Sequence, residues 1–263
     1  MASSRPRTYR TEAVVLRQMP LGEADRILTL HTRNMGKVRA VAKGVRRPRS
    51  RLGGHLELLN HVSVSLSVGR NLDVVNEAEI VRSFTGFRDD LSRLSRAIYL
   101  SELVDRFTVE GSSSFDVYRM LLGVFDRLDR SDESDLLLRH FEVHILEASG
   151  YRPELQRCVS CRSTLMPGDH HFSCANGGIF CPECRGVSAD ALIFVSIGAM
   201  KVLRLLQRER DYAGVADVTV SAGILMEVER LLRTYIRYLI ERELKSAEFM
   251  NLVSSQASTT VPH

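Results

Sequence analysis

The chain has 263 residues, of which 44% are hydrophobic and 6% aromatic, and its formal net charge is +4 at pH 7. This length exceeds the ~100 to 150 residues of a common single domain, so we expect two or three domains. The longest unbroken apolar run is only residues 191–195, and no apolar core of an export signal follows the N-terminus. These features exclude a membrane-spanning helix and lead us to expect a soluble, cytoplasmic protein.

The charge is unevenly distributed along the chain. Residues 1–82 carry 15 basic and 7 acidic side chains, a net charge of +8, whereas residues 83–263 carry 21 basic and 25 acidic ones, a net charge of −4. A basic first part on an acidic remainder indicates binding to a polyanion.

The first 82 residues have the pattern of a small antiparallel sheet. Polar and apolar side chains alternate over residues 61–68, as in a strand with one buried and one solvated face. Four more strands are predicted at 11–17, 25–32, 36–45 and 72–80, with turn residues between them. Five short strands without an intervening helix are typical of an OB-fold β-barrel.

From Phe84 onward the apolar period changes to that of helices. Residues 117–128 carry apolar side chains at i, i+3, i+4, i+7, i+8 and i+11. Further helices are predicted at 91–107, 136–148 and 197–209, and from a cap at Ser221 to about residue 245. These apolar stripes most simply face the hydrophobic core, although helices that form a groove for a partner would show the same pattern. The tail from Ser254 lacks this period and is predicted to be disordered.

The predicted strand at 36–45 leads into a cationic segment. Alternation would place Lys37, Arg39 and Lys43 on the solvated face, and eight basic residues but no acidic one occur between Arg33 and Arg51. Guanidinium groups donate paired hydrogen bonds to phosphate oxygens, so we predict phosphate binding here. The alternative is a solvated face whose charge protects an edge strand from aggregation.

Aromatic side chains are scarce in this first part, where Tyr9 is the only one. Proteins that bind single-stranded nucleic acid commonly stack bases on aromatic rings. We therefore expect binding that is mostly electrostatic, poorly selective for sequence and sensitive to salt.

All five cysteines lie between Cys158 and Cys184. Two Cys-x-x-Cys pairs, Cys158/Cys161 and Cys181/Cys184, are separated by nineteen residues, a spacing typical of four-cysteine zinc sites. Four thiolates leave no open coordination position, so the predicted zinc is structural. Cys174, His170 and His171 are weaker candidate ligands, and a redox dithiol is the competing interpretation of the first pair. His140 and His144, four residues apart, are expected to be a partly buried pair rather than metal ligands.

These observations predict an α+β protein in which an N-terminal OB-fold β-barrel precedes an α-helical domain with an embedded four-cysteine zinc module. The expected segments are an OB-fold nucleic-acid-binding domain at 1–82, a helical domain at 83–153 and 189–250, the zinc module at 154–188 and a disordered tail at 251–263. The sequence contains none of the common phosphate-binding, hydrolase or metalloprotease motifs. We expect no enzymatic activity.

The order of these parts resembles the RecO family of bacterial DNA repair proteins from about residue 9 to residue 250. The resemblance rests on Val-Arg-Ala-Val-Ala-Lys-Gly-Val-Arg-Arg-Pro-Arg-Ser-Arg-Leu-Gly-Gly at 38–54, the two cysteine pairs with Gly-Gly-Ile-Phe before the second, and Arg-Glu-Leu-Lys-Ser at 242–246. Cys174 stands where no ligand is expected in that family.

The resemblance implies a recombination mediator of the RecF pathway. Such a protein would bind single- and double-stranded DNA, anneal complementary strands, associate with RecR, engage single-strand binding protein and help RecA load onto coated strands, close to the nucleoid. It also implies DNA contacts, as phosphate partners rather than base readers, by Lys37, Arg39, Lys43, Arg46, Arg47, Arg49 and Arg51. Two alternatives remain: a zinc-containing enzyme that modifies RNA or DNA with an OB-type substrate domain, and a scaffold whose basic loop meets acidic protein tails.

Overall fold

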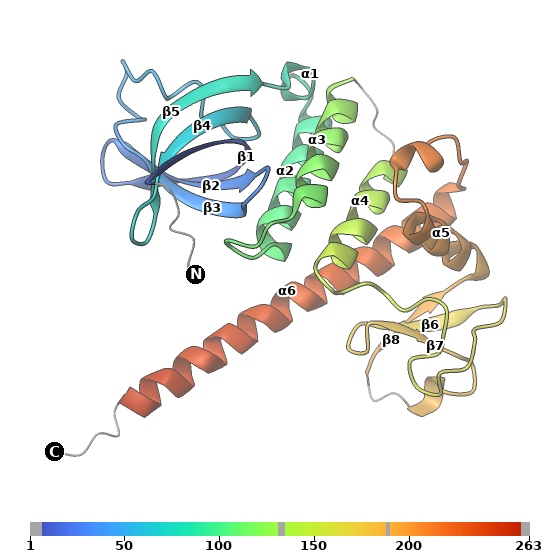
Figure 1. Cartoon of the computed structure of the whole chain (residues 1–263). Coiled ribbons are helices and arrows are strands. Elements are labelled where there is room, and N and C mark those ends of the chain that lie inside the picture. Colours follow the sequence, from blue (N-terminus) through green and yellow to red (C-terminus); the bar gives the residue numbers. More distant parts are fainter. Residues whose placement is uncertain (1–6, 131–134, 188–189, 259–263) are drawn as a thin grey trace. The chain divides into compact units, whose positions relative to one another are not determined.

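The computed structural model describes residues 7–130, 135–187 and 190–258 (Figure 1). The chain divides into two compact units, residues 1–141 and 142–263, and the boundary falls within one helix. Each unit is described separately below. The segment boundaries expected from the sequence stay a prediction, and the first helices belong to the same unit as the β-barrel.

The first unit begins with a closed five-stranded barrel, which confirms the predicted OB-fold. Its strands are β1 (Thr8–Leu21), β2 (Asp25–Thr32), β3 (Gly36–Ala42), β4 (His61–Ser67) and β5 (Asp73–Arg82). The strand order is β1-β2-β3-β5-β4, and β4 pairs with β1 to close the barrel. Only the β3/β5 pairing is parallel. Alternate residues of each strand fill the interior, among them Leu28, Leu30, Val38, Ala40, Val64 and Leu66.

Three helices follow in the same unit: α1 (Thr85–Arg88), α2 (Leu91–Phe107) and α3 (Phe115–Asp129). Asp90 caps α2, because its carboxylate accepts a hydrogen bond from the Arg93 amide at 3.0 Å. The rings of Phe84, Phe87 and Phe125 are buried and packed with centroids 5.4 to 5.6 Å apart, which joins α1 to α3. Because α2 also contacts β1 and β2, the helices pack directly against the barrel.

The second unit contains a small sheet and two further helices. Its elements after α4 (Asp135–Ala148) are β6 (His170–Ser173), β7 (Gly178–Phe180), β8 (Leu192–Val195), α5 (Ile197–Arg208) and α6 (Ala222–Ser258). The sheet has the order β7-β6-β8. Phe172 of β6 packs edge-on against Tyr235 of α6, with ring centroids 5.1 Å apart. This contact fixes the sheet to the helix.

The C-terminal helix is longer than the sequence predicts. The apolar period fades near residue 245, but α6 continues to Ser258 and includes part of the predicted disordered tail. No glycine or proline occurs between Ile224 and Thr260, so no residue type there interrupts helical backbone geometry. The rest of that tail, 259–263, lies outside the described residues.

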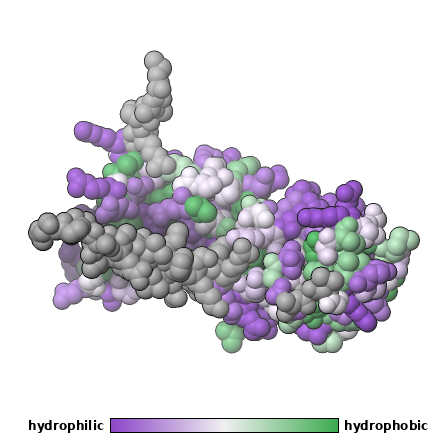
Figure 2. Space-filling view, turned by 90° about the horizontal axis from the view of Figure 1, so that it is seen from below, coloured by the Kyte–Doolittle hydropathy of each residue, from purple (hydrophilic) through white to green (hydrophobic). Residues whose placement is uncertain are grey.

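Across the described part of the chain, none of the helices combines the length and the apolar composition that crossing a bilayer requires. The space-filling view agrees with this, because hydrophilic residues and smaller hydrophobic patches are interspersed over the visible face (Figure 2).

Candidate nucleic-acid interface and metal centre

A long connection between β3 and β4 carries most of the predicted DNA-contacting residues. We call residues 43–54 the cationic loop. Val45, next to its start, is 4% exposed and belongs to the barrel core, as does Leu56 just beyond its end; Leu52 packs against the same core. Backbone hydrogen bonds tighten the loop, from Arg47 to Gly44 at 3.1 Å and from Ser50 to Arg47 at 2.9 Å. The loop is therefore held at both ends by the barrel interior.

The charged side chains of this loop face solvent. Lys43, Arg46, Arg47, Arg49 and Arg51 are all exposed, and Arg39 is exposed on the neighbouring β3. Arg39, Lys43, Arg47, Arg49 and Arg51 form no side-chain hydrogen bond or ion pair with any residue that the structure describes. Their donors are available to a ligand, which is the arrangement that phosphate binding needs.

The loop is also tied to the turn between β1 and β2. The Arg46 amide donates to the Ala24 carbonyl at 2.9 Å, and the Arg46 guanidinium donates to the Gly22 carbonyl at 3.2 Å. Asp25 accepts from the Gly44 amide at 2.7 Å. The β1–β2 turn is one of the surfaces through which OB-folds bind oligonucleotides, so these bonds hold the cations at such a surface.

Lys37 differs from the other six predicted contacts. Its side chain is 15% exposed, and its ammonium group lies 3.3 Å from a carboxylate oxygen of Asp105 in α2. It also donates to the Asp105 backbone carbonyl. Because two of its three N–H donors are already bound to Asp105, the structure separates Lys37 from the exposed cations of the loop.

The four predicted metal ligands come together in the second unit. The sulfur atoms of Cys158, Cys161, Cys181 and Cys184 all lie within 4.8 Å of one another. The Cys161 and Cys181 sulfur atoms are 3.8 Å apart. Four thiolates around one tetrahedral zinc ion, with bonds of ~2.3 Å, have sulfur atoms separated by ~3.8 Å. The geometry therefore fits a four-coordinate metal ion.

Two glycines allow the cysteine pairs to meet. Gly177 has φ +63°, a left-handed conformation that favours glycine. A Cβ on Gly178 would lie 2.5 Å from the Val159 side chain, which belongs to the first pair's loop. The Val159 amide donates to the Ile179 carbonyl at 2.9 Å, so β7 is bonded directly to that loop.

The cysteines have different acidities without a metal. Hydrogen bonds from Ser163 lower the pKa of the Cys161 thiol to about 6, whereas desolvation raises the pKa of the Cys181 thiol to about 12. A divalent cation would favour the thiolate form of all four, as zinc ligation requires.

The other candidate ligands stand outside this group. Cys174 lies in the β6–β7 turn and is not among the clustered cysteines. His170 hydrogen-bonds to the Met166 carbonyl at 2.8 Å, and the His171 ring packs edge-on against Phe194. His140 and His144 are each buried, at 3% and 7% exposure, and neither belongs to a described metal-ligand cluster.

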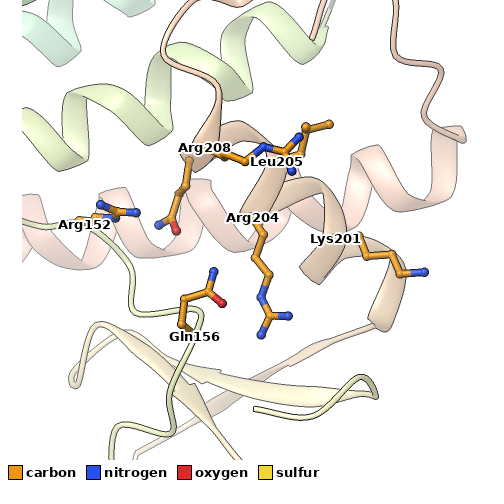
Figure 3. Close-up of a pocket in the computed structure, with 7 residues that line it drawn as sticks. Arg152, Gln156, Lys201, Arg204, Leu205 and Arg208 are labelled. Carbon is orange, nitrogen blue, oxygen red and sulfur yellow. The ribbon is translucent and has the colours of Figure 1, made fainter. Parts of the chain in front are cut away.

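The sequence interpretation missed a cationic hollow in the second unit. It has a volume of about 450 Å³, and its lining includes Arg152, Lys201, Arg204 and Arg208. Arg204 points from α5 toward the segment that carries Gln156 (Figure 3) and donates to the Leu155 carbonyl at 2.7 Å. The spacing i, i+3, i+7 on α5 is the signal that would have indicated one basic face.

Comparison with known proteins agrees with both halves of the structure. Residues 6–84 match the family Recombination protein O N terminal, and residues 88–248 match Recombination protein O C terminal. Three similar proteins are each named DNA repair protein RecO. One from Roseiflexus sp. is 39% identical over 98% of this chain and 90% of its own length. One from Dehalococcoides mccartyi is 36% identical over 95% of this chain and 98% of its own length. One from Symbiobacterium thermophilum is 37% identical over 94% of this chain and 98% of its own length. The chain therefore belongs to the RecO family of DNA repair proteins.

Proposed function

We propose that this protein is a recombination mediator that binds single- and double-stranded DNA and anneals complementary strands without catalysing a reaction. With RecR it would help RecA load onto strands coated by single-strand binding protein, in the cytoplasm at the nucleoid. Family membership supports a role in DNA repair. The observation that carries the proposed mechanism is the set of exposed cations around the cationic loop, without acidic partners among the described residues.

The loop would act on DNA by charge. Arg39, Lys43, Arg46, Arg47, Arg49 and Arg51 would each neutralise a phosphate, and bound counterions would be released. Two complementary strands repel each other through their phosphates, and a cationic surface reduces that repulsion. Base pairing can then proceed without nucleotide hydrolysis.

The four cysteines would hold zinc for structural reasons. Zinc supplies the charge that keeps all four sulfur atoms as thiolates, and the thiolates join the Cys158 loop to the end of β7. With four protein ligands no coordination position is left for a substrate. The second unit would thereby present a stable surface to protein partners, and its cationic hollow suits an anionic one.

Strand annealing without ATP tests the proposal. Two complementary oligonucleotides, one with a fluorophore and one with a quencher, should anneal several-fold faster with the protein at low salt. The variant R46E/R47E/R49E should lose most of this acceleration. A control variant, R106E/R130E/R233E, changes the net charge equally at three exposed positions on α2, at the end of α3 and on α6, and should retain it. Equal loss in both variants, or no acceleration by the wild type, would contradict the proposal.

A further inference from the structure

The four clustered cysteines of the second unit differ in how far solvent reaches them. Cys158 and Cys181 are buried, Cys184 is partly exposed, and Cys161 is exposed. Oxidation of a thiolate depends on its access to the oxidant, so exposure decides which of four thiolates reacts first. A dissolved oxidant therefore reaches the cluster at Cys161.

The loop that carries the first cysteine pair is held at its base and open at its tip. The Leu165 amide donates to the Gln156 carbonyl at 3.0 Å and closes the base of the loop. The Val159 amide donates to the Ile179 carbonyl at 2.9 Å, which fixes the start of the loop to β7. Residues 160–164, by contrast, are all exposed. The tip can therefore shift while the base stays on the sheet.

A buried cysteine of the second pair lies beside Cys161. The Cys161 and Cys181 sulfur atoms are 3.8 Å apart, and a disulfide bond of ~2.05 Å forms if they approach by ~1.8 Å. Cys181 is 6% exposed and directly follows β7, so it is sheltered from a dissolved oxidant. An exposed thiolate next to a second thiolate is the arrangement of an oxidant-sensitive cysteine and its resolving cysteine.

We propose that Cys161 is a site of oxidation by hydrogen peroxide, that Cys181 resolves it, and that the resulting disulfide releases the metal. The Cys161 thiolate attacks one peroxide oxygen, the O–O bond breaks, hydroxide leaves, and Cys161 becomes a sulfenic acid. The Cys181 thiolate then attacks this sulfur atom, the S–O bond breaks, and a second hydroxide leaves. Two thiolates together lose two electrons, and one peroxide gains them.

This inference rests on the proposed structural zinc and adds a modification to the same site. Only Cys158 and Cys184 remain as ligands after the disulfide has formed, whereas a structural zinc site uses four. The disulfide still joins the Cys158 loop to the end of β7, but the segment that carries Cys184 loses its attachment. Oxidised protein should therefore unfold at a temperature between those of the zinc-loaded protein and the reduced, zinc-free protein.

Ser163 provides a test that leaves the ligands in place. Its hydroxyl oxygen lies 3.0 Å from the Cys161 sulfur atom and donates to the thiolate. This hydrogen bond withdraws charge from sulfur, and a less basic thiolate is a weaker nucleophile. Ser163 is exposed, so Ser163→Ala should fold normally. At equal peroxide concentration it should release zinc ~2- to 3-fold faster than the wild type.

Treatment of the zinc-loaded protein with hydrogen peroxide tests the proposal. A colorimetric chelator measures zinc release, and peptide mass spectrometry maps the disulfide. We expect one zinc released per chain, one disulfide that joins Cys161 to Cys181, and recovery of zinc binding after reduction. Alkylation of untreated protein should modify Cys161 before the other three clustered cysteines. The control Cys174→Ser removes the cysteine outside the cluster and should release zinc at the wild-type rate.

A disulfide that omits Cys161 or Cys181 would overturn the inference, as would zinc that stays bound in excess peroxide or whose release requires Cys174. An unchanged or slower rate in Ser163→Ala would contradict Cys161 as the attacking thiolate. Failure of the metal assignment looks different, because the untreated protein would then contain no zinc. The disulfide map would still decide whether Cys161 and Cys181 form the oxidised pair.

Discussion

The ammonium group of Lys37 in β3 lies 3.3 Å from a carboxylate oxygen of Asp105 in α2. The two side chains are 15% and 22% exposed, so both charges are largely removed from water. This ion pair connects the barrel to the helix that follows it. Although Lys37 shares a strand with Arg39, its position gives it a structural role.

Replacing Lys37 with Met should therefore lower stability without weakening DNA binding by more than ~2-fold. We expect the free energy of unfolding to fall by ~1 to 3 kcal/mol, because Asp105 is left partly buried with only Arg17, 4.0 Å away, as a basic neighbour. Urea denaturation and oligonucleotide anisotropy measure the two effects. Arg39→Met is the matched variant, and it should weaken DNA binding while leaving the free energy of unfolding nearly unchanged. If K37M binds DNA as weakly as R39M, Lys37 is a direct contact after all.

The salt dependence of binding should report how many cations touch phosphates. If about five of the six exposed cations contact a single strand, the logarithm of the affinity should fall with that of the salt concentration with a slope near −3.5. The R46E/R47E/R49E variant should flatten this slope by about 2. A wild-type slope near zero would show that these side chains do not bind phosphates.

Replacing Cys181 with Ser should remove the metal and destabilise the second unit. Loss of a structural zinc removes binding free energy that contributes to folding, so a clear drop in thermal stability is expected. Metal analysis should give one zinc per wild-type chain and much less for the variant. Cys174→Ser is the control, because Cys174 lies outside the cluster, and it should keep the metal. Normal zinc content in C181S would refute the assigned ligand set.

Stability should also decrease on acidification because of His31. This side chain is fully buried, and desolvation lowers its pKa to about 4, against ~6.5 in an unfolded chain. The unfolded state thus binds a proton at a higher pH than the folded state does. The stabilisation from neutral His31 is therefore complete above pH ~6.5, and up to ~3 kcal/mol of it is lost as the pH falls toward 4.

The comparison with His31→Gln isolates this effect from the titration of carboxylates. Denaturation curves at several pH values should show that wild-type stability falls more steeply than that of H31Q between pH 6.5 and 4. Parallel pH profiles would mean that His31 titrates alike in both states.

Gly36 should tolerate no side chain. It has φ +65°, and a Cβ there would lie 1.7 Å from the Ser112 carbonyl oxygen in the connection between α2 and α3. Gly22 has φ +57° but no heavy atom within 4 Å of such a Cβ. Gly22→Ala should therefore cost only the backbone strain of ~1 to 2 kcal/mol, and Gly36→Ala distinctly more. Thermal denaturation compares the two, and equal losses would contradict the close packing at Ser112.

Local patterns in the sequence predicted the helices and strands. Contacts between residues far apart in the chain determined the features that the sequence could not predict. Alternation at residues 61–68 and the heptad-like spacing at 117–128 correspond to β4 and α3. Cysteine spacing predicted the four-cysteine cluster, because two short Cys-x-x-Cys loops can bring four sulfur atoms together with few other constraints on the fold. The pairing of Lys37 with Asp105 spans 68 residues, so nothing near Lys37 signals it.

The register of the barrel strands was hidden from sequence reasoning for the same reason. Met19, Ile27, Val41 and Val74 become neighbours only through the register of four strands. A bulge between Val15 and Arg17 shifts the alternation of β1, so Met19 faces outward and Gln18 inward. An extra residue of this kind cannot be located from polarity alone.

In the cationic loop, different residues set the backbone path and carry the positive charge. Val45 and Leu56 give the loop its path, while the arginines between them add nothing to the hydrophobic interior. Evolution can consequently add, remove or move positive charges there with little risk of unfolding the molecule.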